Sequence, residues 1–389
     1  MPLLFILGLA GFASACSLRA TDPMLTLMAD DLSVSLQQAA LLTSCFAVPY
    51  ALMQLILGPV GDAVGKTRLI RVVLGLLTLG QALSAIAPDY HWLVIGRVLT
   101  GSVSGGIIPV AMAVIGDRVA LEERQISIGR FLLGVILGQM GGAFLAGHLA
   151  NSLGWRGVFA ILAAIAALAF ALSLRSLRGD PPATRPSFAT AMNGYRAVFS
   201  NPAAISVYGL VCLEGMLIFA AMPFLGVSLT RIAGALPENA GNVLAIWAMG
   251  GVIYSLAVRR LVRQLGLWRM MQLGGLLAGL ALIACAPALP WPAVAAIFLI
   301  NGFGYYMIHN TLQTQATELA PSARGSALAL FSCALFLGQG LGPLVAGGVA
   351  AQFGYGAMFI TLGGPLILLG FIGAPRLRHL QARAQTGKS

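Results

Sequence analysis

The sequence predicts an all-α membrane protein whose chain crosses the bilayer about twelve times, in two halves of similar design. The first observation is composition: 58% of the 389 residues are hydrophobic and only 9% are charged. Soluble domains carry about 25% charged residues because their surfaces face water. The second is a series of apolar runs, each near the roughly 20 residues that a helix needs to span a bilayer. The third is an internal repeat with an offset of 200 residues.

The apolar runs are separated by charged residues or by Pro and Gly. They lack the two-residue alternation that membrane β-strands show, so helices are favoured over a barrel. The first six predicted spans cover residues 3–27, 39–60, 70–87, 92–115, 127–150 and 157–174. The second six cover residues 204–227, 241–258, 270–287, 292–312, 326–350 and 355–374.

The chain is strongly basic, with a formal net charge of +11. With the N-terminus inside, most of its 23 Lys and Arg residues fall on cytoplasmic loops and tails. This asymmetry follows the positive-inside rule, which predicts that both termini are cytoplasmic. The basic charge is therefore explained by membrane topology, and no nucleic-acid partner is expected.

A shift of 200 residues aligns the two halves without a gap between 124–159 and 324–359. Spaced glycines and a glutamine coincide, and Pro23 falls on Pro223. We therefore predict a six-helix half over 1–174, a cytoplasmic linker over 175–203 with a short helix near 189–198, and a second six-helix half over 204–389. A parallel repeat of this kind is typical of transporters whose substrate site lies between the halves.

The segment after the second span reads Gly58-Pro-Val-Gly-Asp62-Ala-Val-Gly65-Lys66-Thr-Arg68. It resembles the signature loop of the major facilitator superfamily, G-x-x-x-D-[RK]-x-G-[RK]-[RK], although Ala63 and Thr67 replace two of its cations. The resemblance implies a twelve-helix transporter in which Asp62 latches a conformational state by contacting the N-terminus of the eleventh helix. A phosphate loop is excluded because one residue is missing between the glycines. The expected latch consists of Gly58, Asp62, Gly65, Lys66, Arg68 and Asp117.

Two further motifs support the same resemblance. The fourth span places Arg97 and a series of small residues at a strict four-residue step down to Asp117, a stripe on which another backbone can approach closely. The fifth span resembles the antiporter motif of the drug:proton branch, with Ala143 where its proline is expected. Gly154-Trp155-Arg156, also common in this branch, follows. The expected packing residues are Gly101, Gly105, Pro109, Gly138, Gly142, Gly147, Gly338, Gly342 and Pro343.

Acidic residues inside the membrane are the candidates for proton coupling. Glu214 lies about eleven residues into the seventh span, or ~15 Å at 1.5 Å per residue, close to the bilayer midplane. A carboxylate is disfavoured there, and a neutral acid that ionises on wetting suits proton coupling. A protonated glutamic acid bonded to a neighbouring helix is the structural alternative. Asp22 can pair with Arg19, one turn earlier, or with Arg97.

Asn301, Tyr305 and His309 repeat every four residues in the tenth span, so they share one helix face. The family resemblance assigns helices 1, 4, 7 and 10 to a central cavity, and this face is expected to line it. A satisfied packing histidine is the alternative for His309. Weaker candidates for the cavity are Tyr50, Gln54, Gln139, Trp247, Tyr254 and Gln339. The four histidines have no metal-ligand spacing, so neither a metal nor another cofactor is expected.

These observations predict a monomeric, non-enzymatic secondary transporter in the inner membrane of a bacterium. It is expected to export a small organic solute in exchange for protons. Two alternatives remain: a facilitator or proton symporter without an export role, and a membrane sensor or embedded enzyme. The first span begins almost at Met1, so a few N-terminal residues are expected to be missing. No cation precedes that span, which argues against a cleaved signal peptide.

Overall fold

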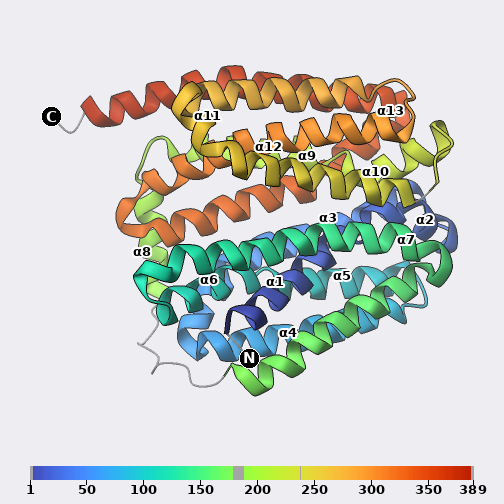
Figure 1. The fold of residues 1–389 in the computed structure, drawn as a ribbon, viewed down its shortest axis with the longest axis horizontal. Helices are drawn as coiled ribbons and strands as arrows, with labels where there is room; N and C mark the ends of the chain where they lie inside the picture. The colour runs from blue at the N-terminus through green and yellow to red at the C-terminus, as the bar shows by residue number, and fades with distance from the viewer. Residues whose placement is uncertain (1–2, 178–187, 237, 387–389) are drawn as a thin grey trace. The chain divides into compact units, whose positions relative to one another are not determined.

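The computed structural model describes residues 3–177, 188–236 and 238–386, and the regular structure within them is helical. The chain divides into two compact units, Met1–Thr190 and Ala191–Ser389 (Figure 1). The short helix predicted near 189–198 is present as α8 (Phe188–Phe199), which contains the boundary between the units. The two units are described separately below.

The first unit contains the elements up to the boundary, and their order follows the predicted spans closely. They are α1 (Leu3–Arg19), η1 (Asp22–Met24), α2 (Leu25–Asp31), α3 (Leu36–Val64), α4 (Lys66–Ala85), α5 (Tyr90–Ser104), α6 (Ile107–Arg118) and α7 (Leu121–Ser176).

The second unit begins within α8 and has a similar element order. Its elements are α9 (Ala204–Phe219), α10 (Met222–Val227), η2 (Ser228–Ile232), α11 (Glu238–Ala284), α12 (Trp291–Leu319), η3 (Pro321–Ala323) and α13 (Arg324–Thr386).

Three of these helices are too long for a single span, and each reverses direction at one glycine. Gly154 in α7, Gly266 in α11 and Gly354 in α13 have φ of 67°, 70° and 83°. Residues with a Cβ adopt such positive φ values with difficulty, whereas glycine does so readily. Nine helical segments of the described chain are long and apolar enough to cross a membrane. Dividing three of them at their glycines gives twelve spans and supports the predicted fold class.

The first span of each unit breaks at a proline. A proline ring clashes with the carbonyl of the residue four positions earlier. Accordingly, α1 ends at Arg19, four residues before Pro23, and α9 ends at Phe219, four residues before Pro223. Leu3–Asp31 and Ala204–Thr230 are nevertheless each one candidate span, so the predicted spans 3–27 and 204–227 are confirmed with a break inside each.

The fourth span, predicted over 92–115 and found as Tyr90–Arg118, is also interrupted. The α5 helix ends at Ser104 and α6 starts at Ile107, after Gly105 and Gly106. Pro109 lies four residues after Gly105, so the same steric clash accounts for the break. As a result, Arg97 and Asp117 lie on separate helices.

The resemblance to the signature suggested that the segment 58–68 is a loop. In the structure it is almost entirely helical. The α3 helix continues to Val64 and α4 begins at Lys66, so the only non-helical residue is Gly65, with φ of 96°. Near the other end of the first unit, the predicted fifth and sixth spans, 127–150 and 157–174, leave a link over 151–156. The reversal lies at Gly154, and Gly157 is already helical.

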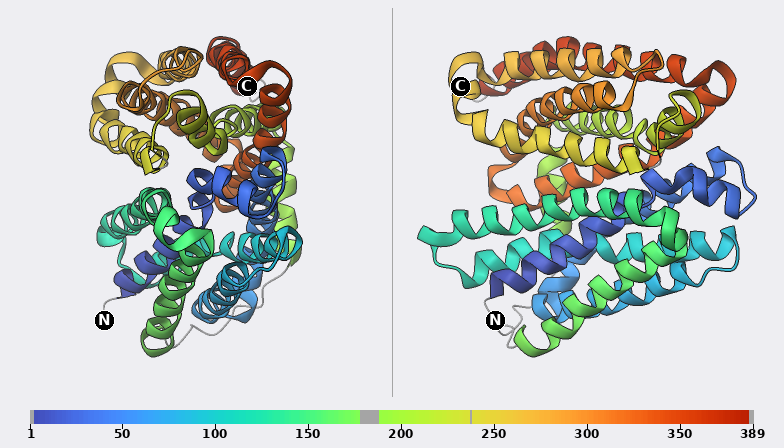
Figure 2. Two further views of the ribbon diagram at one scale, coloured as in Figure 1. Left: turned by 90° about the vertical axis from the view of Figure 1, so that its right-hand side faces the viewer. Right: turned by 45° about the vertical axis from the view of Figure 1, so that its right-hand side comes forward.

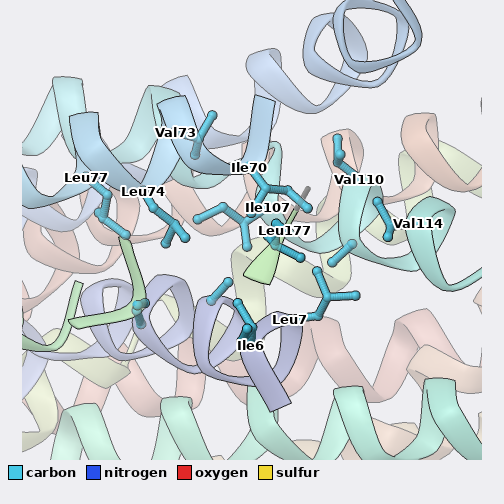
Figure 3. Close-up of a cluster of buried hydrophobic side chains, with 14 of the residues drawn as sticks. Ile6, Leu7, Ile70, Val73, Leu74, Leu77, Ile107, Val110, Val114 and Leu177 are labelled. Atoms are coloured by element: carbon cyan, nitrogen blue, oxygen red, sulfur yellow. The ribbon is translucent and has the colours of Figure 1, made fainter. Parts of the chain in front are cut away.

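Apolar packing holds the first unit together. One buried cluster joins side chains from α1, α4, α6 and α7 (Figure 3). The two views of Figure 2 show the arms of α7 beside α1 within this unit, and the two helices are in direct contact. Outward-facing side chains are apolar as well: Leu79 is 59% exposed and Leu256, in the second unit, 84%. Such surfaces suit lipid rather than water.

In both units, helices approach each other closely at glycines that occupy corresponding positions of the 200-residue repeat. A Cβ on Gly138 would collide with the backbone of Phe12, and one on Gly342 with that of Met216. These pairs belong to a series offset by 200 residues: Gly138 on Phe12, Gly142 on Cys16, Gly338 on Cys212 and Gly342 on Met216. The internal repeat of the sequence is therefore also a repeat of helix contacts, α1 with α7 and α9 with α13.

Candidate functional site

The signature segment forms a compact charged cluster around Lys66. Its Nζ lies 2.6 Å from Oδ2 of Asp117 and 3.2 Å from Oδ1 of Asp62. Lys66 begins α4 and Asp117 is near the end of α6, so the cluster joins three helices of the first unit. Sequence reasoning selected all three residues and missed this pairing. Here the partner of Asp62 is the lysine one turn later, and the latch between helices stays a prediction.

The other members of the expected latch lie close to this cluster along the chain. Gly58 is half-buried in α3, and Gly65 separates α3 from α4. Arg68 is exposed in the first turn of α4 and has an interaction of its own. Of these three residues, Gly65 therefore forms the turn between α3 and α4.

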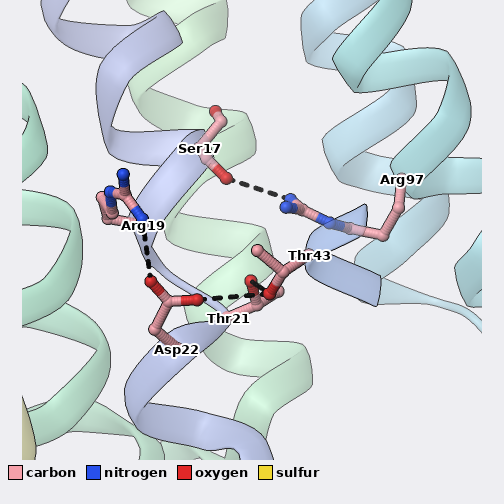
Figure 4. Close-up of polar contacts among 6 residues, drawn as sticks. All are labelled: Ser17, Arg19, Thr21, Asp22, Thr43 and Arg97. Atoms are coloured by element: carbon pink, nitrogen blue, oxygen red, sulfur yellow. Dashed lines mark hydrogen bonds and ion pairs between the residues drawn. The ribbon is translucent and has the colours of Figure 1, made fainter. Parts of the chain in front are cut away.

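A buried ionic group surrounds Asp22 in the first unit (Figure 4). The carboxylate accepts from Arg19 Nη1 at 3.3 Å and from Thr43 Oγ1 at 3.2 Å. Asp22 is fully buried and Arg19 only 4% exposed. Of the two partners considered for Asp22, the structure places Arg19 in the ion pair. The pairing of Asp22 with Arg97 was not found among the described residues.

Arg97 is fully buried and is held mainly by backbone oxygens. Its Nη1 donates to the Ser17 carbonyl at 3.0 Å and its Nε to the Leu42 carbonyl at 3.3 Å. The last four carbonyls of a helix lack helical partners, so the end of α1 at Arg19 provides the first of these acceptors. The guanidinium also lies 4.4 Å from the centre of the Phe46 ring. Thus α5 is connected to α1 and α3 by one cation.

The network around Arg97 contains donors and acceptors that are not fully used. Gln81 donates through Nε2 to Ser17 Oγ. Arg97 Nη2 and Gln81 Oε1 are buried and have no hydrogen-bond partner in the described structure. Burying such atoms costs free energy unless another conformation or a bound molecule satisfies them. The site therefore has the capacity for one more polar partner.

The second unit contains the other buried acid. Glu214 in α9 is fully buried, and its Oε2 lies 3.5 Å from Nδ1 of His309 in α12. The same histidine nitrogen lies 3.2 Å from the Tyr305 hydroxyl. An acid, an imidazole and a phenol are therefore adjacent. Sequence reasoning selected all three residues but did not pair Glu214 with His309.

Aromatic rings surround this acid–histidine pair. The Tyr305 ring lies 5.3 Å from Phe219 and 5.4 Å from Trp247, measured between ring centres. The His309 ring lies 5.0 Å from Phe331. These distances are those of favourable edge-to-face and tilted contacts. The pair thus occupies an apolar environment built by α9, α11, α12 and α13.

Asn301, the third residue of the predicted tenth-span face, connects helices. It is 1% exposed, accepts from Trp247 Nε1 at 2.9 Å and donates to the Ala278 carbonyl at 2.8 Å. Trp247 and Ala278 belong to different arms of α11, so Asn301 joins both arms to α12. This geometry is structural, and a cavity role for Asn301 stays a prediction.

The weaker cavity candidates are distributed over both units. Tyr254 accepts from Asn310 at 2.8 Å, a second connection between α11 and α12. Tyr50 and Gln54 are buried on α3, and Gln139 is half-buried on α7. Gln339, at the repeat position of Gln139, is buried on α13 and its Oε1 has no partner among the described residues.

The remaining packing residues lie in closely packed or half-buried parts of helices. Gly101 and Gly105 approach the backbones of Phe46 and Tyr50 on α3 too closely for a Cβ. Gly147 and Pro343 are buried, and Pro109 is half-buried.

The sequence showed the Gly154-Trp155-Arg156 motif but did not predict the cluster that it forms with Asp31. Trp155 Nε1 donates to Asp31 Oδ2 at 2.9 Å, and Arg156 Nη1 donates to the same oxygen at 2.6 Å. Arg156 also donates to the Ala87 carbonyl through Nε at 3.2 Å. The Gly154-Trp155-Arg156 motif therefore ties α7 to the ends of α2 and α4. Nothing near Asp31 in the sequence indicated this partner.

No group of three or more His, Cys, Asp or Glu side chains in the described part of the chain is placed to hold a metal ion.

Comparison with known proteins identifies the family. The family model described as Major Facilitator Superfamily matches residues 7–331. The chain belongs to the major facilitator superfamily. It is 28% identical to the uncharacterized MFS-type transporter YceJ of Bacillus subtilis, a match that covers 84% of this chain and 83% of that one. It is 25% identical to the multi-drug resistance efflux pump PmrA of Streptococcus pneumoniae, over 90% and 89% of the two chains.

A solved structure has the same fold. The nucleoside transporter NupG superposes with a TM-score of 0.78 over 96% of this chain and 98% of that chain, at 14% identity. At this identity the likeness concerns the fold alone. The family and its relatives are membrane transporters, so this chain is a multi-pass membrane transporter of a small solute.

Proposed function

We propose that this transporter exports a small organic solute in exchange for protons by alternating access, and that its chain consists of two six-helix halves, 1–174 and 204–389, joined by the linker 175–203. The observation that carries the proposal is Glu214, a fully buried acid next to His309 within an aromatic environment. A buried charge is costly unless it is paired, and the group can instead take up a proton. Protonation of this pair is thus sensitive to hydration.

The proton-coupling role follows from how the pair responds to water. In the dry state the acid favours its neutral form, because burial disfavours an isolated carboxylate. Opening toward water stabilises separate charges and permits proton exchange. A substrate that replaces this water changes the same balance, which links solute binding to proton release.

The first unit supplies the second polar site. Asp22, Arg19 and Arg97 form a buried group with a donor on Arg97 that has no partner among the described residues. We propose that this donor binds Asp22 or the solute in another conformation. Export as the direction is supported by the similarity to a multi-drug efflux pump.

The proposal extends to the membrane in which the transporter lies and to its orientation there. We place it as a monomer in the bacterial inner membrane with both termini in the cytoplasm, because its cations concentrate on the predicted cytoplasmic segments.

The test uses Glu214→Gln, which imitates the protonated acid at nearly constant volume. In proteoliposomes this variant should exchange solute down a gradient and lose uphill transport driven by a pH step. Asp22→Asn is the matched control, compared at an equal amount of folded protein because it removes the counter-charge of Arg19. Normal pH-driven transport in Glu214→Gln, with loss in Asp22→Asn, would move the coupling site to the first unit. Absence of pH-driven transport in the wild type would favour a facilitator.

A further inference from the structure

A cavity with basic walls lies in the second unit, between α11 and α13. Its volume is about 410 Å³. It is formed where the second arm of α11 begins, just after the reversal at Gly266, and where the apolar part of α13 ends. None of its lining residues, all within the described chain, is acidic. The polar and aromatic side chains of the lining are Trp268, Arg269, Gln272, Arg378 and His379.

The two arginines of this cavity are available to a ligand. Arg269 and Arg378 are exposed side chains. Neither makes a hydrogen bond or an ion pair with another residue that the structure describes. By contrast, Lys66 and Arg156 in the first unit each have a carboxylate partner. No residue in the described part of the chain therefore compensates the positive charge of the cavity.

The position of the cavity corresponds to the membrane boundary. The second arm of α13 carries exposed apolar side chains such as Leu368 and Ile372, which are 55% and 61% exposed. Cationic side chains follow immediately, from Arg376 onward. Arginine and tryptophan are the residues that membrane proteins place at the level of lipid headgroups. The basic lining therefore faces the layer that contains phosphate groups.

We propose that this cavity binds the headgroup phosphate of an anionic phospholipid in the adjoining leaflet. Guanidinium groups form two parallel hydrogen bonds to phosphate oxygens, and two arginines on facing helices can hold one phosphate from both sides. Gln272 and Trp268 add hydrogen-bond donors, and Ala374 and Pro375 add apolar surface to the lining. Basic pockets between membrane helices are known to bind acidic headgroups.

The lipid would add a link between two helices that already pack directly, with Gly275 of α11 against Gly370 of α13. Arg269 belongs to α11 and Arg378 to the last turns of α13. A phosphate between them would neutralise both cations and hold the end of α13 against α11. Binding is therefore expected to stabilise the folded protein in proportion to the occupancy of the site.

The test measures thermal unfolding of the purified full chain in uncharged detergent. Phosphatidylglycerol should raise Tm, whereas phosphatidylcholine and inorganic phosphate at equal concentration should not. In the double variant Arg269→Gln/Arg378→Gln, apparent affinity for phosphatidylglycerol should fall roughly 30-fold, as expected for the loss of two surface cations that face an acidic lipid. Native mass spectrometry should show one fewer retained phosphatidylglycerol molecule.

The matched control removes two arginines elsewhere on α11. Arg259 and Arg263 are exposed, lie near the Gly266 reversal and do not line the cavity. Arg259→Gln/Arg263→Gln should retain the effect of phosphatidylglycerol. An equal loss in this control would show diffuse charge attraction and overturn the proposal, and so would equal stabilisation by inorganic phosphate. The pair Arg269→Lys/Arg378→Lys keeps both charges and loses the paired guanidinium hydrogen bonds, so its affinity should lie between those of the wild type and the glutamine pair. Affinity equal to that of the wild type would show that charge alone acts and would contradict the proposed contact.

Discussion

At the scale of single residues, the buried charged side chains of Asp22 and Arg97 each have specific partners. Asp22 is neutralised by Arg19 and bonded by Thr43. Arg97 instead uses the carbonyl of Ser17, which is available because Pro23 ends the helix before it. A sequence can indicate that a buried arginine needs partners, but backbone acceptors are invisible in it. For this reason Arg19 was predictable as one of two candidate partners of Asp22, whereas the bond from Thr43 and the partners of Arg97 were not.

Neutralising Asp22 should destabilise the protein. In Asp22→Asn, Arg19 remains buried without its counter-charge, and breaking a buried ion pair in this way costs about 3 to 5 kcal/mol. The expected result is a clearly lowered Tm in detergent.

The control is Glu318→Gln. Its ion pair with Arg324 is more than half exposed on both sides, and exposed pairs contribute little. Equal Tm values in the two variants would show that the ion pair of Asp22 does not contribute to the stability of the fold.

At the scale of elements, prolines and glycines determine where helices break, reverse and approach. Three prolines, Pro23, Pro109 and Pro223, account for the breaks that the hydropathy pattern did not reveal. Apolar runs predict where a span lies because lipid exposure controls composition. They do not report the backbone clash that divides a span, since a proline is nearly as compatible with an apolar run as its neighbours. Other prolines, such as Pro49 in α3, remain inside helices.

The glycine contacts between α1 and α7 allow a matched test. In Gly138→Ala the new Cβ would meet the backbone of Phe12, and the two helices must separate. Overpacking of this kind costs about 1 to 3 kcal/mol. Gly129 lies on the same helix with open space around it, so Gly129→Ala should be neutral or stabilising by up to about 1 kcal/mol from helix propensity.

Thermal unfolding of the two alanine variants gives the measurement. Equal effects would indicate that helix propensity, and not close approach, decides the stability of this pair. The equivalent variants Gly338→Ala and Gly348→Ala repeat the comparison in the second unit, where Gly348 is the position with open space.

At the scale of the whole molecule, the repeat in the sequence corresponds to a repeat in structure, because the second unit has the same features as the first. Corresponding breaks and glycine contacts recur 200 residues apart. The fold class and family were predictable because composition, run length and the signature segment all reflect the membrane and the fold. The pairing of Glu214 with His309 was not, since two helices distant in sequence meet there and no spacing reports such a contact.

The predicted topology places the end of α7's first arm outside and the end of α11's first arm inside. Exposed positions Ser152 and Arg259 suit cysteine labelling with an impermeant maleimide on intact cells, in a background without native thiols. Ser152→Cys should react and Arg259→Cys should not. The reverse pattern would invert the orientation. Ser187, another position expected to face the cytoplasm, lies outside the described residues, and so does most of the side-chain detail of the tail after Pro375.

The latch at Lys66 should affect transport more than folding. Asp62 is exposed, so Asp62→Asn should leave Tm nearly unchanged. If the cluster stabilises one conformation, the transport rate should fall roughly tenfold, within the usual range of conformational coupling free energies of about 1 to 3 kcal/mol. Transport at the wild-type rate would remove Asp62 from the mechanism.

The most direct test of the central claim is proton movement by the wild-type protein. Proteoliposomes loaded with a pH-sensitive dye receive an external solute, first identified by a thermal-shift screen of candidate ligands on the purified protein. Entry of the solute by proton antiport moves protons out, so the lumen should become alkaline, and the change should disappear in Glu214→Gln. Acidification of the lumen would indicate symport, and solute entry without a pH change would indicate facilitation. Either result would contradict the proposed antiport.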